Sequence, residues 1–240
     1  MKLIRRCILI IVLVLSCSPS NELQGKPYDP VTPVSDIPDS NPQSNEDPDD
    51  GLESESVNLL FVGNSLTYTN NLPELVEDLA KTKGKNVSTK MIALPNYAII
   101  DHLDYSNDAE IEIRSKKYDY VIIQQGPSSQ SEGRRLLFEG AKRFNDLCKQ
   151  NESKLVIFMV WPSRRYYYTF DGVILNHTEA ARAYGAILCP VGTEWKRHFD
   201  STGDFSYYGS DQFHPSLKGS EEAARIIVNT LFKVEDRKPE

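Results

Sequence analysis

Short apolar runs rich in β-branched residues recur along the chain, and segments with a helical spacing of apolar residues lie between them. Runs of this length and composition are typical of the buried strands of parallel sheets. The pattern therefore predicts five strands. They span residues 57–62, 86–93, 118–124, 154–160 and 186–191.

Two of the predicted helices are well defined by their apolar faces. The first has Asn71 as its N-cap, Pro73 near the first helical position and Gly84 just beyond its end. Its apolar face consists of Leu72, Leu75, Val76, Leu79 and Ala80. The second helix spans residues 217–232, and its inner face consists of Ala224, Ile227, Val228 and Leu231.

The alternation of strands and helices places the chain in the α/β class. Five strands with intervening helices predict a three-layer α/β/α fold around a five-stranded parallel sheet with right-handed crossovers. In open parallel sheets, ligands bind at the edge formed by the carboxyl ends of the strands. Residues that follow the strands are therefore the first candidates for a functional site.

The N-terminus has a different pattern. Three basic residues precede an apolar run at residues 7–15, which is shorter than the ~20 residues needed to cross a bilayer. This pattern predicts a secretory signal peptide, residues 1–16. Because Ser16-Cys17 ends the run, the segment resembles the lipobox of bacterial lipoproteins, which implies that Cys17 is lipidated. The alternative is an ordinary signal peptide with an incidental cysteine.

Residues 18–56 hold ten acidic residues, one lysine and seven of the fourteen prolines, with almost nothing apolar. Such a segment cannot bury enough surface to offset the entropy lost on ordering. Residues 17–56 are therefore predicted to be a disordered, lipid-anchored tether, and residues 57–240 the folded domain.

The acidic charge of the chain also lies mostly in the tether. Of the formal charge of −7, the signal peptide contributes +3 and the tether −9, so the folded domain is close to neutral. A nucleic-acid-binding surface would need clustered basic charge. No nucleic-acid partner is expected.

A serine follows the first predicted strand. Glycine at position 63 lets the backbone turn tightly, so that the hydroxyl and amide of Ser65 can stand above the sheet. This residue type in this position fits a nucleophile. The alternative is plain turn chemistry, which Gly63-Asn64-Ser65 also favours.

A hydroxyl nucleophile needs a base, and the base needs an orienting group. His214 lies directly before the last predicted helix, three residues after Asp211. In a turn, this spacing lets the carboxylate accept from one ring nitrogen while the other faces a serine. The alternative is a capping aspartate beside a surface histidine. Together with a serine at a strand end, the pattern favours a catalytic triad.

The motif FVGNSLT near the start of the domain and the motif DQFHP near its end resemble the first and last blocks of the SGNH (GDSL-type) hydrolase superfamily. The resemblance covers roughly residues 57–233 and implies a flavodoxin-like α/β/α fold. It also implies that Ser65 is the nucleophile and that Asp211 and His214 complete the triad.

The middle blocks of that superfamily usually supply a glycine after the second strand and an asparagine after the third, which help to bind the oxyanion. Here Asn96 lies near the expected glycine, and Ser128 or Ser129 stands where asparagine is expected. The predicted oxyanion donors are the Ser65 amide, Asn96, and Gln125 or Ser128. Loop hydrogen bonding is the alternative for Gln125 and the serines.

Other residues carry weaker predictions. The segment WPSRRYYYTF, residues 161–170, follows the fourth strand, and its arginines and tyrosines could bind a sugar or an acidic group, or serve loop packing. His102 and His177 are expected on helix surfaces or at caps. Cys148 and Cys189 are expected to be buried and unpaired, one disulfide being the alternative.

These patterns predict an exported, lipid-anchored serine esterase of the bacterial cell envelope, at the periplasmic or outer-membrane surface. Its expected substrate is a small-molecule or glycan ester, with acylated glycans the first choice, and the lipid anchor is its only expected membrane contact. No metal-ligand spacing, C-x-x-C or phosphate-binding glycine loop is present, so no cofactor is expected. The alternatives are a lipid or small-aryl esterase, and a catalytically silent glycan-binding lipoprotein.

Overall fold

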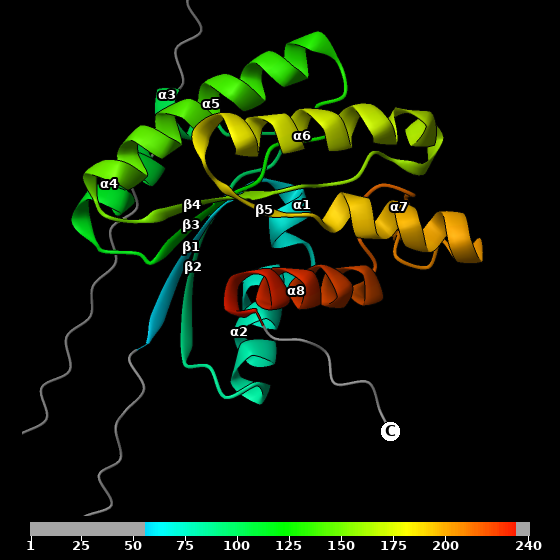
Figure 1. Ribbon diagram of the computed structural model, residues 1–240, viewed down its shortest axis with the longest axis horizontal. Helices are drawn as coiled ribbons and strands as arrows, with labels where there is room; N and C mark the ends of the chain where they lie inside the picture. The colour runs from blue at the N-terminus through cyan, green and yellow to red at the C-terminus, as the bar shows by residue number, and fades with distance from the viewer. Residues whose placement is uncertain (1–55, 234–240) are drawn as a thin grey trace, which may run out of the picture. The chain divides into compact units, whose positions relative to one another are not determined.

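The computed structural model describes residues 56–233. Five strands form one sheet in the order β2-β1-β3-β4-β5, and each neighbouring pair is parallel. The predicted α/β class with a five-stranded parallel sheet is thereby confirmed (Figure 1). The strands are β1 (Val57–Gly63), β2 (Val87–Ala93), β3 (Tyr120–Ile123), β4 (Lys154–Phe158) and β5 (Ile187–Cys189).

Helices connect the strands and cover both faces of the sheet. The helices of the described residues are α1 (Ser65–Tyr68), α2 (Leu72–Thr82), α3 (Asp101–Asp104), α4 (Asp108–Ser115), α5 (Ser131–Gln150), α6 (Phe170–Tyr184), α7 (Val191–Thr202) and α8 (Leu217–Phe232), with 3₁₀ turns at Thr69–Asn71 and Arg164–Thr169. None of the helices among residues 56–233 is long and apolar enough to cross a membrane.

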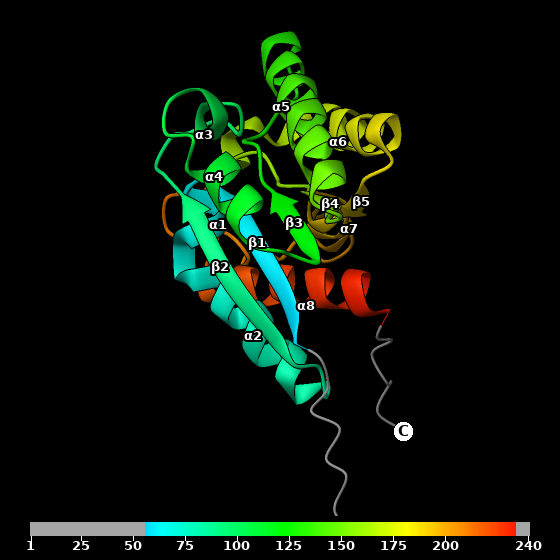
Figure 2. The same cartoon turned by 90° about the vertical axis from the view of Figure 1, so that its left-hand side faces the viewer.

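Alternate residues of β1 enter two different cores. Leu59 and Phe61 of β1 pack with α2, α7 and α8, whereas Leu60 and Val62 pack with α4, α5 and α6. Figure 2 shows the resulting layers, with α2 and α8 on one side of the sheet and α4, α5 and α6 on the other. Because successive side chains of a strand point to opposite faces of the sheet, helices pack on both faces and form the predicted α/β/α arrangement.

An aromatic cluster fixes the loop before α8 to the end of β4. The Trp161 and Trp195 rings stack with their centroids 3.5 Å apart. The Trp161 indole then donates to the Phe213 carbonyl over 3.0 Å, and the Tyr208 hydroxyl donates to the Pro162 carbonyl over 2.8 Å. These bonds hold the chain around residue 213 above the carboxyl ends of the strands.

The helix ends mostly follow the prediction. Pro73 lies in the first turn of α2, Gly84 adopts a left-handed φ of 69° beyond its end, and α8 has the predicted bounds. The prediction that the Asn71 side chain caps α2 is wrong. Asn71 occupies the N-cap position of α2, but its side chain does not cap the helix, because its amide group donates to the Glu74 carboxylate instead.

The two cysteines of the domain behave as predicted. Cys148 and Cys189 are both buried and neither forms a disulfide. Burial raises the pKa of both thiols to about 12, because a thiolate is poorly solvated in an apolar interior. These residues therefore serve as small apolar core side chains.

Candidate active site

Ser65 is the first residue of α1 and follows the carboxyl end of β1 by two positions. Asn64 caps the helix, with its side-chain oxygen accepting from the Leu66 amide over 3.2 Å. A side chain at Gly63 would lie 2.5 Å from the Thr67 hydroxyl and 2.7 Å from the Gln124 amide oxygen. Glycine is therefore required by this close approach, and its φ is not in the left-handed region.

The loop before α8 brings a histidine and an aspartate to this serine. The Ser65 hydroxyl donates to His214 Nε2 over 2.8 Å, and His214 Nδ1 donates to Asp211 Oδ2 over 2.5 Å. The second carboxylate oxygen of Asp211 accepts from the amides of Phe213 and His214, at 3.0 and 2.9 Å. Ser65 and the pair Asp211–His214, which lies 149 positions away at His214, thus form one continuous hydrogen-bond chain.

These bonds determine the charge state of Asp211. Partial burial acts to raise the pKa of this carboxyl, but hydrogen bonds from the His214 ring and from the Phe213 and His214 amides outweigh it. The pKa of Asp211 therefore lies below its usual value. Asp211 is a carboxylate at neutral pH and can hold the His214 ring in one tautomer.

Gln124 supports the turn that carries Ser65, a role that the sequence did not reveal. Its side-chain oxygen accepts from the Asn64 amide over 3.0 Å and from the Thr67 hydroxyl over 2.9 Å. Both partners flank Ser65 in the chain. Gln124 follows β3 directly and is buried, so it ties the nucleophile turn to the neighbouring strand.

Several solved structures share this architecture. The chain is similar to a protein described as a candidate SGNH hydrolase from Slackia heliotrinireducens, with 22% identity and a TM-score of 0.62 over 73% of this chain and 99% of that one. It is also similar to a catalytic mutant of an acetylxylan esterase from Geobacillus stearothermophilus, with 14% identity and a TM-score of 0.58 over 73% and 94%. The chain has the SGNH hydrolase fold.

A third similar structure is a two-domain esterase active on acetylated mannans, with 15% identity and a TM-score of 0.55 over 77% of this chain and 51% of that one. No protein-family model and no curated protein matches the sequence. At these identities the likeness concerns the fold, and the site must be judged by its own geometry.

Two of the predicted oxyanion donors keep a free hydrogen-bonding group. Asn96 lies in an exposed turn after β2 with a left-handed φ of 61°, and its side chain makes no hydrogen bond within residues 56–233. The Gln125 oxygen accepts from the Ile99 amide over 2.9 Å, which turns the Gln125 NH₂ group away from Ile99. That NH₂ group has no acceptor among the described residues.

Ser128 is different, because its groups are already engaged. Its hydroxyl donates to the Gly126 carbonyl over 2.8 Å, and its carbonyl accepts from the Asn176 side chain over 2.6 Å. The residue is buried. This is the loop hydrogen bonding considered as the alternative above, so Ser128 stabilises the loop after β3 and is not retained as an oxyanion donor.

The prediction that His102 and His177 lie on helix surfaces is wrong, since both are fully buried. His102 Nε2 bonds to the Gly63 carbonyl over 2.8 Å, close to the nucleophile turn. His177 Nδ1 bonds to the Val173 carbonyl within α6, also over 2.8 Å. Burial lowers the pKa of His102, and it lowers the pKa of His177 to about 4.

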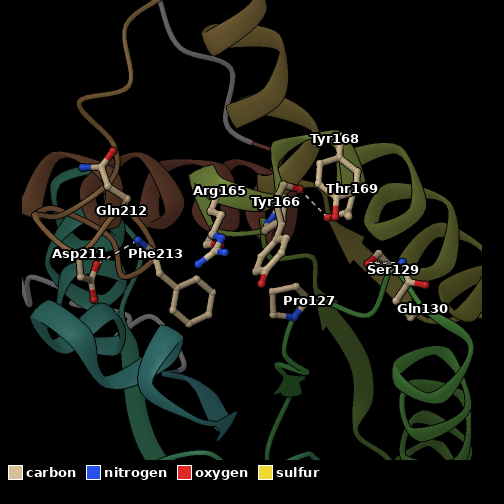
Figure 3. Close-up of a pocket in the computed structure, with 12 residues that line it drawn as sticks. Pro127, Ser129, Gln130, Arg165, Tyr166, Tyr168, Thr169, Asp211, Gln212 and Phe213 are labelled. Atoms are coloured by element: carbon tan, nitrogen blue, oxygen red, sulfur yellow. Dashed lines mark hydrogen bonds between the residues drawn. The ribbon is translucent and has the colours of Figure 1, made fainter.

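A cleft of about 820 Å³ adjoins the triad on the side of Asp211. Figure 3 shows its walls, which come from the loop after β3, the segment after β4 and the loop before α8. Within the structurally described part of the chain, no group of His, Cys, Asp and Glu residues could hold a metal ion. The cleft is lined by Pro127, Ser129, Gln130, Pro162, Ser163, Arg165, Tyr166, Tyr168, Thr169, Asp211, Gln212 and Phe213.

Proposed function

We propose that the protein is a serine ester hydrolase that works through an acyl-enzyme. The supporting observation is the hydrogen-bond chain from Asp211 through His214 to Ser65, with steps of 2.5 and 2.8 Å. These are the distances that general-base activation of a serine requires. The SGNH hydrolase fold, shared with structures named as esterases, supports the same proposal.

In the first half of the reaction, Ser65 Oγ attacks the ester carbonyl while His214 Nε2 accepts the hydroxyl proton. The imidazolium then donates that proton to the departing alkoxide, which leaves as an alcohol and yields the acyl-enzyme. In the second half, Nε2 takes a proton from water, the resulting hydroxide attacks the acyl carbonyl, and the proton returns to Ser65. Asp211 stabilises the imidazolium during both halves.

The negative oxygen of each tetrahedral intermediate needs hydrogen-bond donors. Ser65 begins α1, and the first amides of a helix have no partner within it. We therefore assign the Ser65 amide, the Gln125 NH₂ group and Asn96 to the oxyanion site. Loss of one such donor typically costs about 2.7–4 kcal/mol of transition-state stabilisation.

We further propose that the acyl group is carried by a carbohydrate and that the enzyme acts in the bacterial cell envelope. The names of two similar structures, an acetylxylan esterase and an esterase active on acetylated mannans, support the substrate class. The location is proposed from the predicted signal peptide at residues 1–16, the predicted lipidation site Cys17 and the predicted tether at residues 17–56. Of these, only residue 56 lies within the described residues.

The test is hydrolysis of p-nitrophenyl acetate by the full chain purified in detergent. Wild type should turn the ester over, Ser65→Ala should not, and a control variant, Ser115→Ala, should keep wild-type activity, because Ser115 ends α4 with its hydroxyl on the Glu112 carbonyl. A fluorophosphonate should label wild type and not Ser65→Ala. A folded wild type that neither hydrolyses the ester nor is labelled would refute the proposal and favour a silent binding protein.

A further inference from the structure

The cleft beside the triad contains an arginine that has no acidic partner. Arg165 lines the cleft, and no ion pair within residues 56–233 includes it. Its guanidinium carbon lies 5.8 Å from the centre of the Tyr166 ring. In Figure 3 the Arg165 side chain lies between Phe213 and Tyr166. The neighbouring Arg164, in contrast, donates to Gln212 and stacks on another ring.

In the described part of the chain, no acidic side chain that lines the cleft is available to pair with the positive charge of Arg165. Among the described residues that line the cleft, Asp211 is the only acidic one. Both oxygens of Asp211 already accept hydrogen bonds, from the His214 ring and from two backbone amides. A ligand that enters the cleft therefore meets a guanidinium with unsatisfied donors, which is suited to bind a carboxylate through two parallel hydrogen bonds.

The rest of the wall is aromatic. The rings of Tyr166 and Tyr168 lie 6.3 Å apart at a steep angle, and their residues are 49% and 79% exposed. Exposed aromatic side chains gathered in one cleft are typical of ligand sites. Their flat faces suit the C–H faces of a sugar ring, while the volume of the cleft exceeds the needs of a simple acetate ester.

We propose that this cleft binds the saccharide part of the substrate and that this saccharide carries a carboxylate, as a uronic acid does. Arg165 pairs with the carboxylate, and Tyr166 and Tyr168 pack against the sugar ring. The cleft reaches the triad through Phe213, whose ring centre is 5.1 Å from that of His214, so a saccharide bound there can present an acyl group to Ser65. This inference rests on the proposed esterase function.

The decisive measurement is kcat/KM on two acetylated oligosaccharides, an oligogalacturonate and a neutral xylo-oligosaccharide of equal length and acetyl content. The full chain in detergent should prefer the acidic substrate at least tenfold at low salt, mainly through a lower KM, and the preference should shrink as salt is added. Arg165→Gln should remove the preference. Arg182→Gln should keep it, because Arg182 is an exposed arginine on α6 that likewise has no ion pair in the described chain.

Equal kcat/KM for the two substrates in wild type, or an unchanged preference in Arg165→Gln, would overturn the inference while leaving the esterase function intact. Binding separates the two proposals further. Deacetylated oligogalacturonate should bind Ser65→Ala in calorimetry and should bind the double variant Ser65→Ala/Arg165→Gln at least tenfold more weakly. Equal binding to both would count against the inference, whether or not the wild type hydrolyses esters.

Discussion

The two carboxylate oxygens of Asp211 accept hydrogen bonds from different partners. Oδ2 accepts from the His214 ring, and Oδ1 accepts from the amides of Phe213 and His214. The same side chain therefore shapes the turn and orients the base within it. Since the turn places His214 Nε2 at the Ser65 hydroxyl, the function of Asp211 cannot be separated from the local fold.

Asp211→Asn should lower kcat on p-nitrophenyl acetate by about 10⁴, because an amide in place of Oδ2 favours the wrong tautomer of His214. In wild type, protonation of Asp211 should lower activity only below the pH range in which an aspartate usually titrates, since the pKa of Asp211 lies below its usual value. Stopped assays across pH check both points. Asp200→Asn serves as the control, because Asp200 bonds to Tyr167 and Lys196; near-normal kcat in Asp211→Asn would contradict the triad.

His177 should make the fold sensitive to acid. An unfolded histidine binds its proton near pH ~6.5, whereas burial lowers the pKa of His177 to about 4. Between these values the unfolded state binds more protons, so the free energy of unfolding should decrease as pH falls, by up to about 3 kcal/mol, and level off below about pH 4. His177→Leu should flatten this part of the urea-unfolding curve against pH. An equal slope in the variant would show that His177 does not cause it.

Ser65, His214 and Asp211 could be proposed from the sequence because a serine after a strand, and a histidine three residues after an aspartate just before a helix, already suggest nucleophile, base and orienting group. Gln124 could not be found in this way. Its role depends on which way its amide points after β3, and residue type does not reveal that. The buried positions of His102 and His177 were missed because polar and apolar neighbours are mixed around each of them, and residue type alone does not show which way a histidine ring points.

The sequence predicted helices and strands best where apolar residues recur at a regular helical or strand spacing. The α8 helix has the predicted bounds, and all five predicted strands exist. Strand ends were less certain: β3 covers only Tyr120–Ile123 of the predicted 118–124. The α1 helix was not predicted, because four residues are too few to show a helical period. That short helix nevertheless begins with the candidate nucleophile.

Gly219→Ala tests how closely α8 packs. Alanine normally favours a helix by up to about 1 kcal/mol over glycine. Here its Cβ would lie 2.2 Å from the Tyr207 carbonyl and 2.9 Å from the Trp195 ring, and such overpacking costs about 1–3 kcal/mol. Urea unfolding should therefore show a net loss of stability. Gly126→Ala should change stability by less than about 0.5 kcal/mol, since nothing lies within 4 Å of its Cβ; a stabilised Gly219→Ala would disprove the packing argument.

In the whole molecule, the site joins segments that are far apart in the chain. Ser65 and His214 are separated by 149 positions. Ser65 follows the carboxyl end of β1, the edge at which parallel sheets bind ligands, whereas His214 reaches it from the loop between α7 and α8. Their meeting was predicted from the spacing of Asp211 and His214 and from the family resemblance. The cleft was not predictable in the same way, because its shape depends on how the loops after β3 and β4 pack against the loop before α8.

The distribution of charge along the chain is compatible with the proposed tether. The domain is nearly neutral, while residues 18–56 combine acidic charge with seven prolines. As a flexible coil, such a tether would have a root-mean-square reach of about 35 Å, and proline and like-charge repulsion should extend it. We therefore propose that the catalytic domain reaches acylated glycans at some distance from the membrane that anchors it.

Cys17→Ala should release the protein from the membrane without affecting the domain. Cys17 follows the apolar run at residues 7–15 by two positions, and lipidation at this position would anchor the chain after the signal peptide is removed. Because both hydrophobic cores are formed by residues far from Cys17 in the chain, thermal unfolding and turnover of p-nitrophenyl acetate should remain at wild-type values. Fractionation of cells, together with mass spectrometry of the N-terminal peptide, makes the comparison. A variant that stays in the membrane fraction would show that the chain is held there by something other than a lipid on Cys17.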